Sequence, residues 1–171
     1  MTCDTCKAPM KERRTTAETP YFYRIGGLPR VGLSGITLYE CPRCKGDSPV
    51  IPKIGELHKV ITRWLVEKSA PLTGDELRFL RKNAGFAAQK FAALIGIDPA
   101  HLSRIENGKR EGLGPATDRL ARAIVTAAVS GGEAARQVLL EFADAAEDRH
   151  KGRQFELFTL ERNRWKVAKA A

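Results

Sequence analysis

The stretch that decides the fold of this chain is IDPAHLSRIENGKR, residues 97–110. Asp98 can cap a new helix, and Pro99 suits its first turn, where no backbone N–H is needed. The helical spacing then places Ile97, Leu102 and Ile105 on a buried face. The opposite face carries small, polar and basic side chains, namely Ala100, His101, Ser103 and Arg104.

A short helical segment, residues 89–96, precedes this stretch and ends at Gly96, where a glycine permits a tight bend. A helix, a turn and a second helix with a polar, basic face form the geometry that lays one helix in the DNA major groove. The sequence therefore predicts a DNA-binding helix-turn-helix over residues 87–107.

The expected DNA contacts lie on this face and just beyond it. Arg104 is the candidate base reader, because a guanidinium can make a bidentate contact with guanine. Lys109 and Arg110 follow the helix and are expected at the phosphate backbone. His101 is either a contact or a solvated side chain, and Glu106 is expected to hold Arg104 or another basic residue. The full predicted set is Gln89, Ala100, His101, Ser103, Arg104, Lys109 and Arg110.

The surrounding pattern predicts a compact all-α domain over residues 72–149, similar in size to a lambda-repressor domain. Thr73 and Glu76 have the spacing of a capping box, which starts a helix at this point. In that helix we expect Leu77, Phe79 and Leu80 in the core, and Arg78, Arg81 and Lys82 in solvent. Two further helices are expected over residues 116–129 and 133–149, with Arg119 and Arg122 on a solvated face. Apolar residues exceed what one such domain buries, which favours a homodimer.

Four cysteines form two CxxC pairs, Cys3/Cys6 and Cys41/Cys44. Two such pairs supply the four thiolates of a closed, tetrahedral structural zinc site. A redox pair and a disulfide are the competing interpretations. Residues 21–25 and 31–40 are predicted as strands that bring the two pairs together, so residues 1–53 are expected to form a small β-rich domain that holds one Zn²⁺.

The rest of the chain connects or follows these two domains. Residues 54–68 have helical apolar spacing, and residues 54–71 are predicted as a helical connector. His58 lies in this helix, but four cysteines already complete a structural site. Residues 150–171 are a tail or a β-hairpin, with strands at 155–160 and 165–168.

The composition and charge of the chain limit the classes of function that it could have. The net charge of +9 favours a polyanionic partner, and a hydrophobic content of 43% supports a folded core. We see no apolar run that could span a bilayer and no secretion signal, so we expect a cytoplasmic protein with no membrane partner. No Ser/His/Asp or Cys/His arrangement is apparent among three histidines, so we expect no enzyme activity.

The two CxxC pairs, LTGDELRFLRKNAG at 72–85, LSRIENG at 102–108 and GPATDRL at 114–120 together resemble the YgiT/MqsA family. The resemblance covers most of the chain and implies an N-terminal zinc domain followed by an Xre-type helix-turn-helix. It implies that Cys3, Cys6, Cys41 and Cys44 bind structural zinc. It further implies a bacterial transcriptional repressor of the type II antitoxin class, which binds a toxin and represses the shared operator as a dimer.

Two departures from the family pattern bear on DNA recognition. The family prototype has asparagine at the position of Ala100, so its operator sequence is not transferred to this chain. A Thr-Gln pair usually opens the helix before the turn, whereas this chain has Ala87-Ala88, with Gln89 one position later.

A standalone zinc-containing regulator without a toxin is the alternative function for this chain. A purely RNA-binding zinc protein leaves the helix-turn-helix unexplained.

Overall fold

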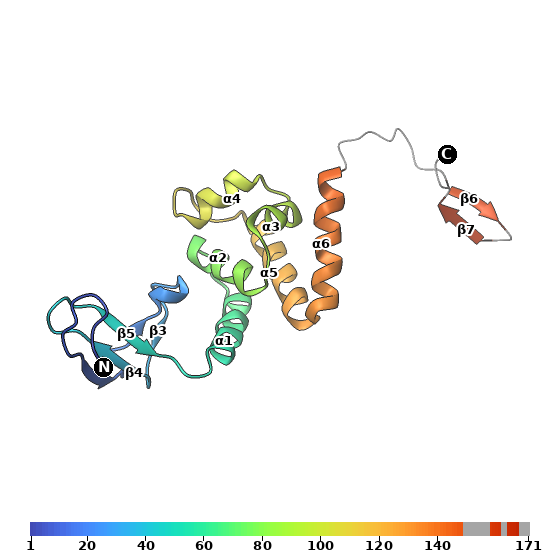
Figure 1. Cartoon of the computed structure of the whole chain (residues 1–171). Coiled ribbons are helices and arrows are strands. Elements are labelled where there is room, and N and C mark those ends of the chain that lie inside the picture. Colours follow the sequence, from blue (N-terminus) through green and yellow to red (C-terminus); the bar gives the residue numbers. More distant parts are fainter. Residues whose placement is uncertain (149–157, 162–163, 168–171) are drawn as a thin grey trace.

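The computed structural model describes residues 1–148, 158–161 and 164–167. A small N-terminal region of short strands carries the four cysteines, and an all-α region of six helices follows it (Figure 1). This confirms the predicted fold class. The strands are β1 (Lys11–Arg14), β2 (Tyr21–Phe22), β3 (Gly32–Leu33), β4 (Thr37–Glu40) and β5 (Asp47–Val50), and a 3₁₀ turn η1 spans Arg24–Gly26. The helices are α1 (Ile54–Glu67), α2 (Gly74–Asn83), α3 (Ala88–Ile95), α4 (Pro99–Glu106), α5 (Pro115–Ser130) and α6 (Gly132–Asp148).

The strand pairing corrects part of the prediction for the N-terminal region. β2 pairs with β3 antiparallel as expected, but η1 interrupts the first predicted strand. The second predicted strand divides into β3 and β4, and β4 lies between β1 and β5 in an antiparallel sheet of order β1-β4-β5. Neither β1 nor β5 was predicted. β1 reads Lys-Glu-Arg-Arg and is mostly exposed, so it lacks the alternation of apolar and polar residues that identifies a strand.

The helix boundaries follow the local signals in the sequence. The Thr73 N–H donates to Glu76 Oε2 at 2.7 Å, and the Glu76 N–H donates to Thr73 Oγ1 at 3.4 Å, which completes the predicted capping box. Asp98 Oδ1 accepts from the N–H groups of Ala100 and His101 at 2.8 and 3.1 Å. Gly96 turns the chain between α3 and α4 with a φ of 70°, a conformation in which glycine is not strained.

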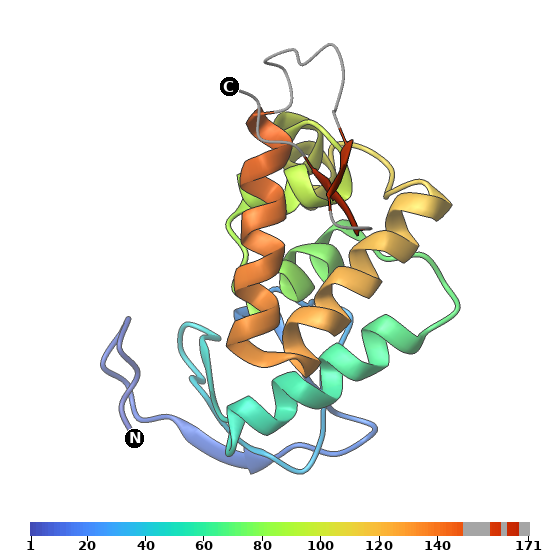
Figure 2. The same cartoon turned by 90° about the vertical axis from the view of Figure 1, so that its right-hand side faces the viewer.

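One hydrophobic cluster runs through both regions. It includes Tyr23 and Leu38 of the N-terminal region, Leu65 of α1, and Leu80 and Leu102 of the helical region. α1, predicted as a connector, therefore packs its buried face into the same core as its neighbours. The views of Figures 1 and 2 agree that α5 lies beside α6.

Arg81 is buried, which contradicts its predicted exposure. Its Nε and Nη2 donate to the two carboxylate oxygens of Glu106 at 2.7 and 2.8 Å, and its Nη1 donates to the Phe86 carbonyl at 2.9 Å. Glu106 thus holds a basic side chain as expected, but that side chain is Arg81 rather than Arg104. The helical pattern of α2 could not show this, because the partner lies on another helix.

Arg122 is also buried rather than solvated. Its Nε donates to Asp118 Oδ2 at 2.7 Å, and its two Nη groups donate to the carbonyls of Leu65, Lys68 and Ala70 at 3.0, 2.6 and 2.7 Å. Asp118 Oδ1 accepts from the Leu72 N–H at 2.9 Å. This pair of side chains therefore fixes the segment between α1 and α2 onto α5.

The C-terminal hairpin is formed by β6 (Phe158–Glu161) and β7 (Arg164–Val167), which pair antiparallel. Glu161 and Arg164, predicted in the turn, are strand residues that pair with each other. Of the predicted strands, residues 155–157 and 168 lie outside the described residues. Among the helices of the described residues, none has the length and apolar content that crossing a bilayer requires.

Removing the Arg122 side chain should destabilise the fold strongly. Arg122→Ala leaves the buried Asp118 carboxylate without its cationic partner and frees the backbone carbonyls that Arg122 binds, which should cost about 3–5 kcal/mol of unfolding free energy. Equilibrium urea unfolding measures this loss. The matched control is Arg119→Ala, an exposed residue of the same helix, which should change stability by less than about 0.5 kcal/mol. Equal effects of the two substitutions would contradict the structural role of Arg122.

Candidate DNA-binding face and cysteine cluster

α4 presents an exposed face above a buried one. Leu102 and Ile105 are 0% and 1% exposed, and they hold the helix on the core. Ala100, Ser103 and Arg104 are exposed on the other side, and His101 is half-buried beside them. Ile97, predicted as buried, is half-buried and packs against the edge of the core.

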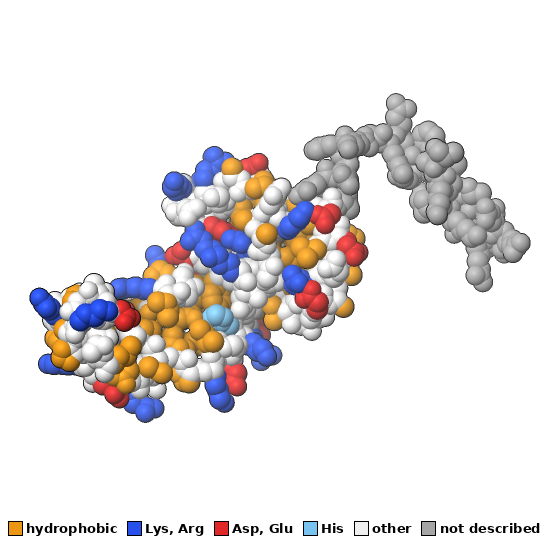
Figure 3. Space-filling view, in the orientation of Figure 1, with side chains coloured by type: hydrophobic (Ala, Val, Ile, Leu, Met, Phe, Trp, Pro, Cys, Tyr) orange, Lys and Arg blue, Asp and Glu red, His pale blue; other side chains and the backbone are white. Residues whose placement is uncertain are grey.

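The flanks of α4 add further exposed polar and basic side chains. Lys109 and Arg110 are exposed just after the helix, and Gln89 is exposed in the first turn of α3. Figure 3 shows Lys and Arg side chains over α4 and α2 on this side of the molecule. The predicted residues therefore lie on exposed or half-buried positions of α3, α4 and the loop that follows. Ala87 provides no side-chain cap for α3, in keeping with the missing Thr-Gln pair.

Two residues in contact at the end of α4, Arg78 and Asn107, take part in this region, and neither was identified from the sequence as a functional residue. Arg78 of α2 donates to Asn107 Oδ1 at 2.6 Å. Asn107 Nδ2 donates in turn to the Ser103 carbonyl at 2.7 Å and to Ser103 Oγ at 3.3 Å. Arg78 therefore supports the end of α4 from the neighbouring helix. Asn107 follows the last turn of a helix in the sequence, but only the fold places Arg78 beside it.

The sulfur atoms of the four cysteines lie close together in the N-terminal region. All four Sγ atoms are within 4.8 Å of one another, with Cys3 to Cys44 and Cys6 to Cys41 at 3.4 Å. Four sulfurs at 2.3 Å from a central zinc ion would be about 3.8 Å apart, so the arrangement fits a tetrahedral metal site. All four cysteines are free, and 3.4 Å far exceeds a disulfide bond, so the disulfide interpretation is wrong for this structure.

The two CxxC segments have the same backbone geometry. The Lys7 N–H donates to the Cys3 carbonyl at 2.9 Å, and the Lys45 N–H donates to the Cys41 carbonyl at 3.0 Å. Lys7 and Lys45 both adopt a positive φ, 59° and 61°. This shared turn points both sulfurs of each segment toward the other pair, which is the local geometry of a metal-binding knuckle.

The electrostatics of the cluster also suit a cation. The backbone N–H of Cys44 points to the Cys41 sulfur and lowers the pKa of Cys41 to about 6. The Cys6 sulfur accepts from the backbone at Ala8, yet the neighbouring Cys41 sulfur and desolvation raise the pKa of Cys6 to about 12. A divalent cation among the sulfurs would offset their mutual repulsion and favour the thiolate form of all four.

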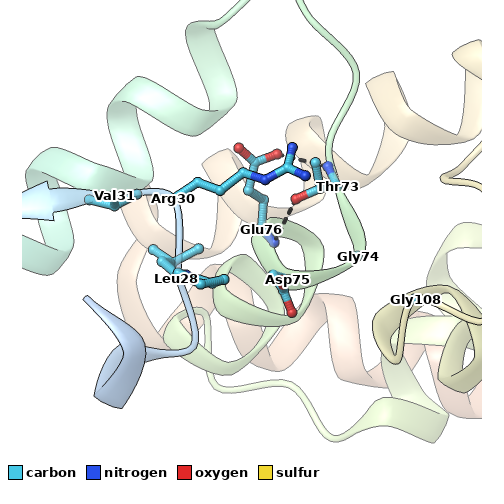
Figure 4. A pocket seen from close by; sticks show the side chains of 9 residues that line it. Leu28, Arg30, Val31, Thr73, Gly74, Asp75, Glu76 and Gly108 are labelled. Carbon is cyan, nitrogen blue, oxygen red and sulfur yellow. Dashed lines mark hydrogen bonds between the residues drawn. The ribbon is translucent and has the colours of Figure 1, made fainter. Parts of the chain in front are cut away.

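A pocket of about 180 Å³ lies between the loop at Leu28–Val31 and the start of α2 (Figure 4). Arg30 reaches from the loop toward the first turn of α2 in this view. The Glu76 carboxylate already accepts from the Thr73 N–H and from Lys68 Nζ, at 2.7 and 2.6 Å. Glu76 therefore serves to cap α2 and to anchor Lys68.

Comparison with known proteins identifies a domain in the helical region. A family described as a helix-turn-helix domain matches residues 73–137, which is less than half of the chain. No curated protein and no solved structure matches. The chain thus carries a helix-turn-helix domain, the module of DNA-binding regulators, behind a cluster of four cysteines that could hold a metal ion.

Loss of one cysteine should release the metal and unfold the N-terminal region while the helices persist. Cys44→Ser removes one of four ligands, and a small β-rich region with such a site depends on its metal for folding. Bound metal, measured by elemental analysis after dialysis, should fall from one ion per chain to near zero, with little loss of helical circular dichroism. Acidification should release the metal as well, because protons compete for the thiolates.

The control is Thr5→Ala, an exposed residue between Cys3 and Cys6 that offers no sulfur. It should retain one ion per chain. Full metal content in Cys44→Ser would contradict the four-cysteine site.

Proposed function

We propose that this protein is a sequence-specific transcriptional repressor that inserts α4 into the DNA major groove. The observation that carries the proposal is the exposed face of Ala100, Ser103 and Arg104 on a helix held by buried Leu102 and Ile105. Such a helix can approach base edges without disturbing its own packing. The double-stranded operator is the partner of this face.

The exposed residues divide by chemistry into base readers and phosphate contacts. Arg104 and Ser103 can hydrogen-bond to base edges, and Ala100 can contact a thymine methyl group. Lys109, Arg110 and Gln89 supply backbone contacts, which position the protein and depend on salt. His101 is a further contact at the start of α4.

We propose that Cys3, Cys6, Cys41 and Cys44 hold one structural Zn²⁺ per chain. Zinc matches a tetrahedral set of four thiolates, and such a set leaves no open position for a substrate. We therefore propose a stabilising metal and no enzyme activity. Operator binding and reduced thiolates both suit the bacterial cytoplasm.

The division of the chain follows from these roles. We propose a zinc-binding domain at 1–53, a helical connector at 54–71, a helix-turn-helix domain at 72–149 and a tail at 150–171. The connector and the contacts of Arg122 would fix the orientation of the zinc-binding domain relative to the helix-turn-helix domain.

We also propose that the chain acts as a homodimer, so that two copies of α4 reach successive major grooves. α5 and α6 leave large apolar side chains exposed, including Phe142 at 59%, Val138 at 49% and Leu120 at 44%. A second copy of the chain would cover these side chains, since exposed apolar surface favours association.

The antitoxin role is the most specific part of the proposal. It is supported by the resemblance to the YgiT/MqsA family, in which a cysteine-bearing domain precedes the helix-turn-helix. In this arrangement the N-terminal domain would bind the toxin while α4 represses the shared operon. The alternative is a standalone zinc-containing regulator.

Arg104→Ala should reduce affinity for the specific operator by about 1–3 kcal/mol and relax its sequence preference, because a bidentate base contact is lost. Lys109→Ala is the contrasting variant. It should weaken binding to all sequences and reduce the slope of log affinity against log salt by about one unit. Fluorescence anisotropy with operator and random duplexes distinguishes the two effects. An equal loss on both duplexes for Arg104→Ala would remove Arg104 from the base contacts.

Phe142→Ser should shift the protein from dimer toward monomer by removing exposed apolar surface from the proposed interface. Sedimentation equilibrium measures the dimer dissociation constant, which should rise at least tenfold, equivalent to about 1.4 kcal/mol. Glu141→Ser, at the neighbouring exposed position of α6, is the control and should change it little. An unchanged constant for Phe142→Ser would exclude this face from the interface.

Expression of the neighbouring reading frames in bacteria, with and without this protein, tests the antitoxin role. Growth arrest by a neighbour alone, relieved by co-expression and accompanied by a co-purifying complex, is the expected result. If neither neighbour harms growth or binds, the standalone regulator is the remaining function.

A further inference from the structure

The N-terminal region and α2 enclose a recess that the DNA-binding role does not use. It has a volume of about 410 Å³, within the range of small-molecule sites. η1 and the following glycine form one wall, α2 forms the other, and α1 contributes the ring of His58. The lining residues that carry the argument are Arg24, Ile25, His58, Arg78, Phe79 and Lys82.

The base of the recess is aromatic and held in place. His58 Nε2 and the Tyr23 hydroxyl are 2.8 Å apart, and the His58 ring meets the Phe79 ring edge-on with centroids 5.2 Å apart. Gly26 makes this possible, because a Cβ at that position would lie 2.2 Å from the Tyr23 ring. Within the described residues, His58 Nδ1 has no hydrogen-bond partner, so it is available to a ligand.

The walls are positively charged. Arg24, Arg78 and Lys82 line the recess against a single carboxylate, Asp75. Arg24 and Lys82 are exposed and form no ion pair within the described part of the chain. Figure 3 shows hydrophobic side chains exposed where the N-terminal region meets α1 and α2, with Lys and Arg side chains beside them.

We propose that this recess binds a small aromatic anion, such as an aromatic carboxylate. The ring of the ligand packs on His58, Phe79 and Ile25, and its carboxylate faces the three cations of the walls, Arg24, Arg78 and Lys82. A flat apolar body with one anionic group matches an aromatic base beneath cationic walls.

The recess is connected to α4 through Arg78. This side chain lines the recess, donates to Asn107 Oδ1 at 2.6 Å, and has its Nε 3.6 Å from Glu106 Oε2, both at the end of α4. An anion that draws Arg78 toward itself weakens this support of the helix that carries Ser103 and Arg104. Binding therefore lowers operator affinity, a consequence that rests on the proposed DNA-binding function.

Benzoate is the probe, and its neutral analogue benzamide is the matched control. The full chain has only three histidines, so the ring resonances of His58 can be followed by NMR during titration. Benzoate should shift them saturably, and benzamide should not. Lys82→Gln should weaken benzoate binding by about threefold, and the Arg24→Gln/Lys82→Gln double variant by about tenfold, as for exposed charge pairs. Lys59→Gln, an exposed α1 residue outside the recess, should leave it unchanged.

Equal binding of benzamide, absence of saturable shifts at His58, or an unchanged affinity in the double variant would overturn the site. If the double variant instead weakens DNA binding on every sequence and leaves benzoate unaffected, the cations serve DNA phosphates and the proposal is wrong. The titration needs no DNA, so its failure is distinct from a failure of the regulator function. Unchanged operator affinity at saturating benzoate would overturn the coupling through Arg78.

Discussion

The ion pair between Arg81 and Glu106 is the interaction on which the proposed DNA-binding face depends. It joins α2 to the end of α4 through two short hydrogen bonds in a buried setting. The third donor of Arg81 binds the Phe86 carbonyl and so fixes the loop before α3. Since loss of one partner from such a buried pair costs about 3–5 kcal/mol, Arg81 ties α2, the loop before α3 and the end of α4 together. The exposed face of α4 can therefore be held in a fixed orientation toward DNA.

A second buried arginine performs the same task at the junction with the N-terminal region. Arg122, with Asp118, binds the backbone from the end of α1 to Leu72 and so attaches α1 to α5. The hydrophobic cluster continues from α1 into the region of Tyr23 and Leu38. Because the two regions share this core, the recess between η1 and α2 lies beside a common packed interior. A ligand in this recess would contact Arg78, which hydrogen-bonds to Asn107 at the end of α4.

Local signals predicted the parts of the fold that local chemistry decides. The Thr73–Glu76 capping box, the Asp98 cap and the apolar spacing of Leu102 and Ile105 placed α2 and α4 within a residue or two. The exposed residues of α4 followed from the same spacing. Long-range contacts were not predictable, because an arginine on a helix has the same pattern whether it faces solvent or a partner on another element. Arg81 binds Glu106 of α4, Arg78 binds Asn107 at the end of α4, and Arg122 binds carbonyls at the end of α1 and in the segment that follows. The edge strands β1 and β5 were missed because they are short and charged or interrupted by proline, and their pairing is decided by β4.

The central proposal is that α4 of the helix-turn-helix domain reads a DNA sequence. Selection from a random duplex pool by the full-length protein tests that claim most directly. The account predicts enrichment of a two-fold symmetric site whose half-sites are about 10 base pairs apart, because two copies of α4 would meet successive major grooves. A pool that binds in a salt-dependent manner yet shows no enriched sequence would contradict it, since phosphate contacts alone would then explain the binding.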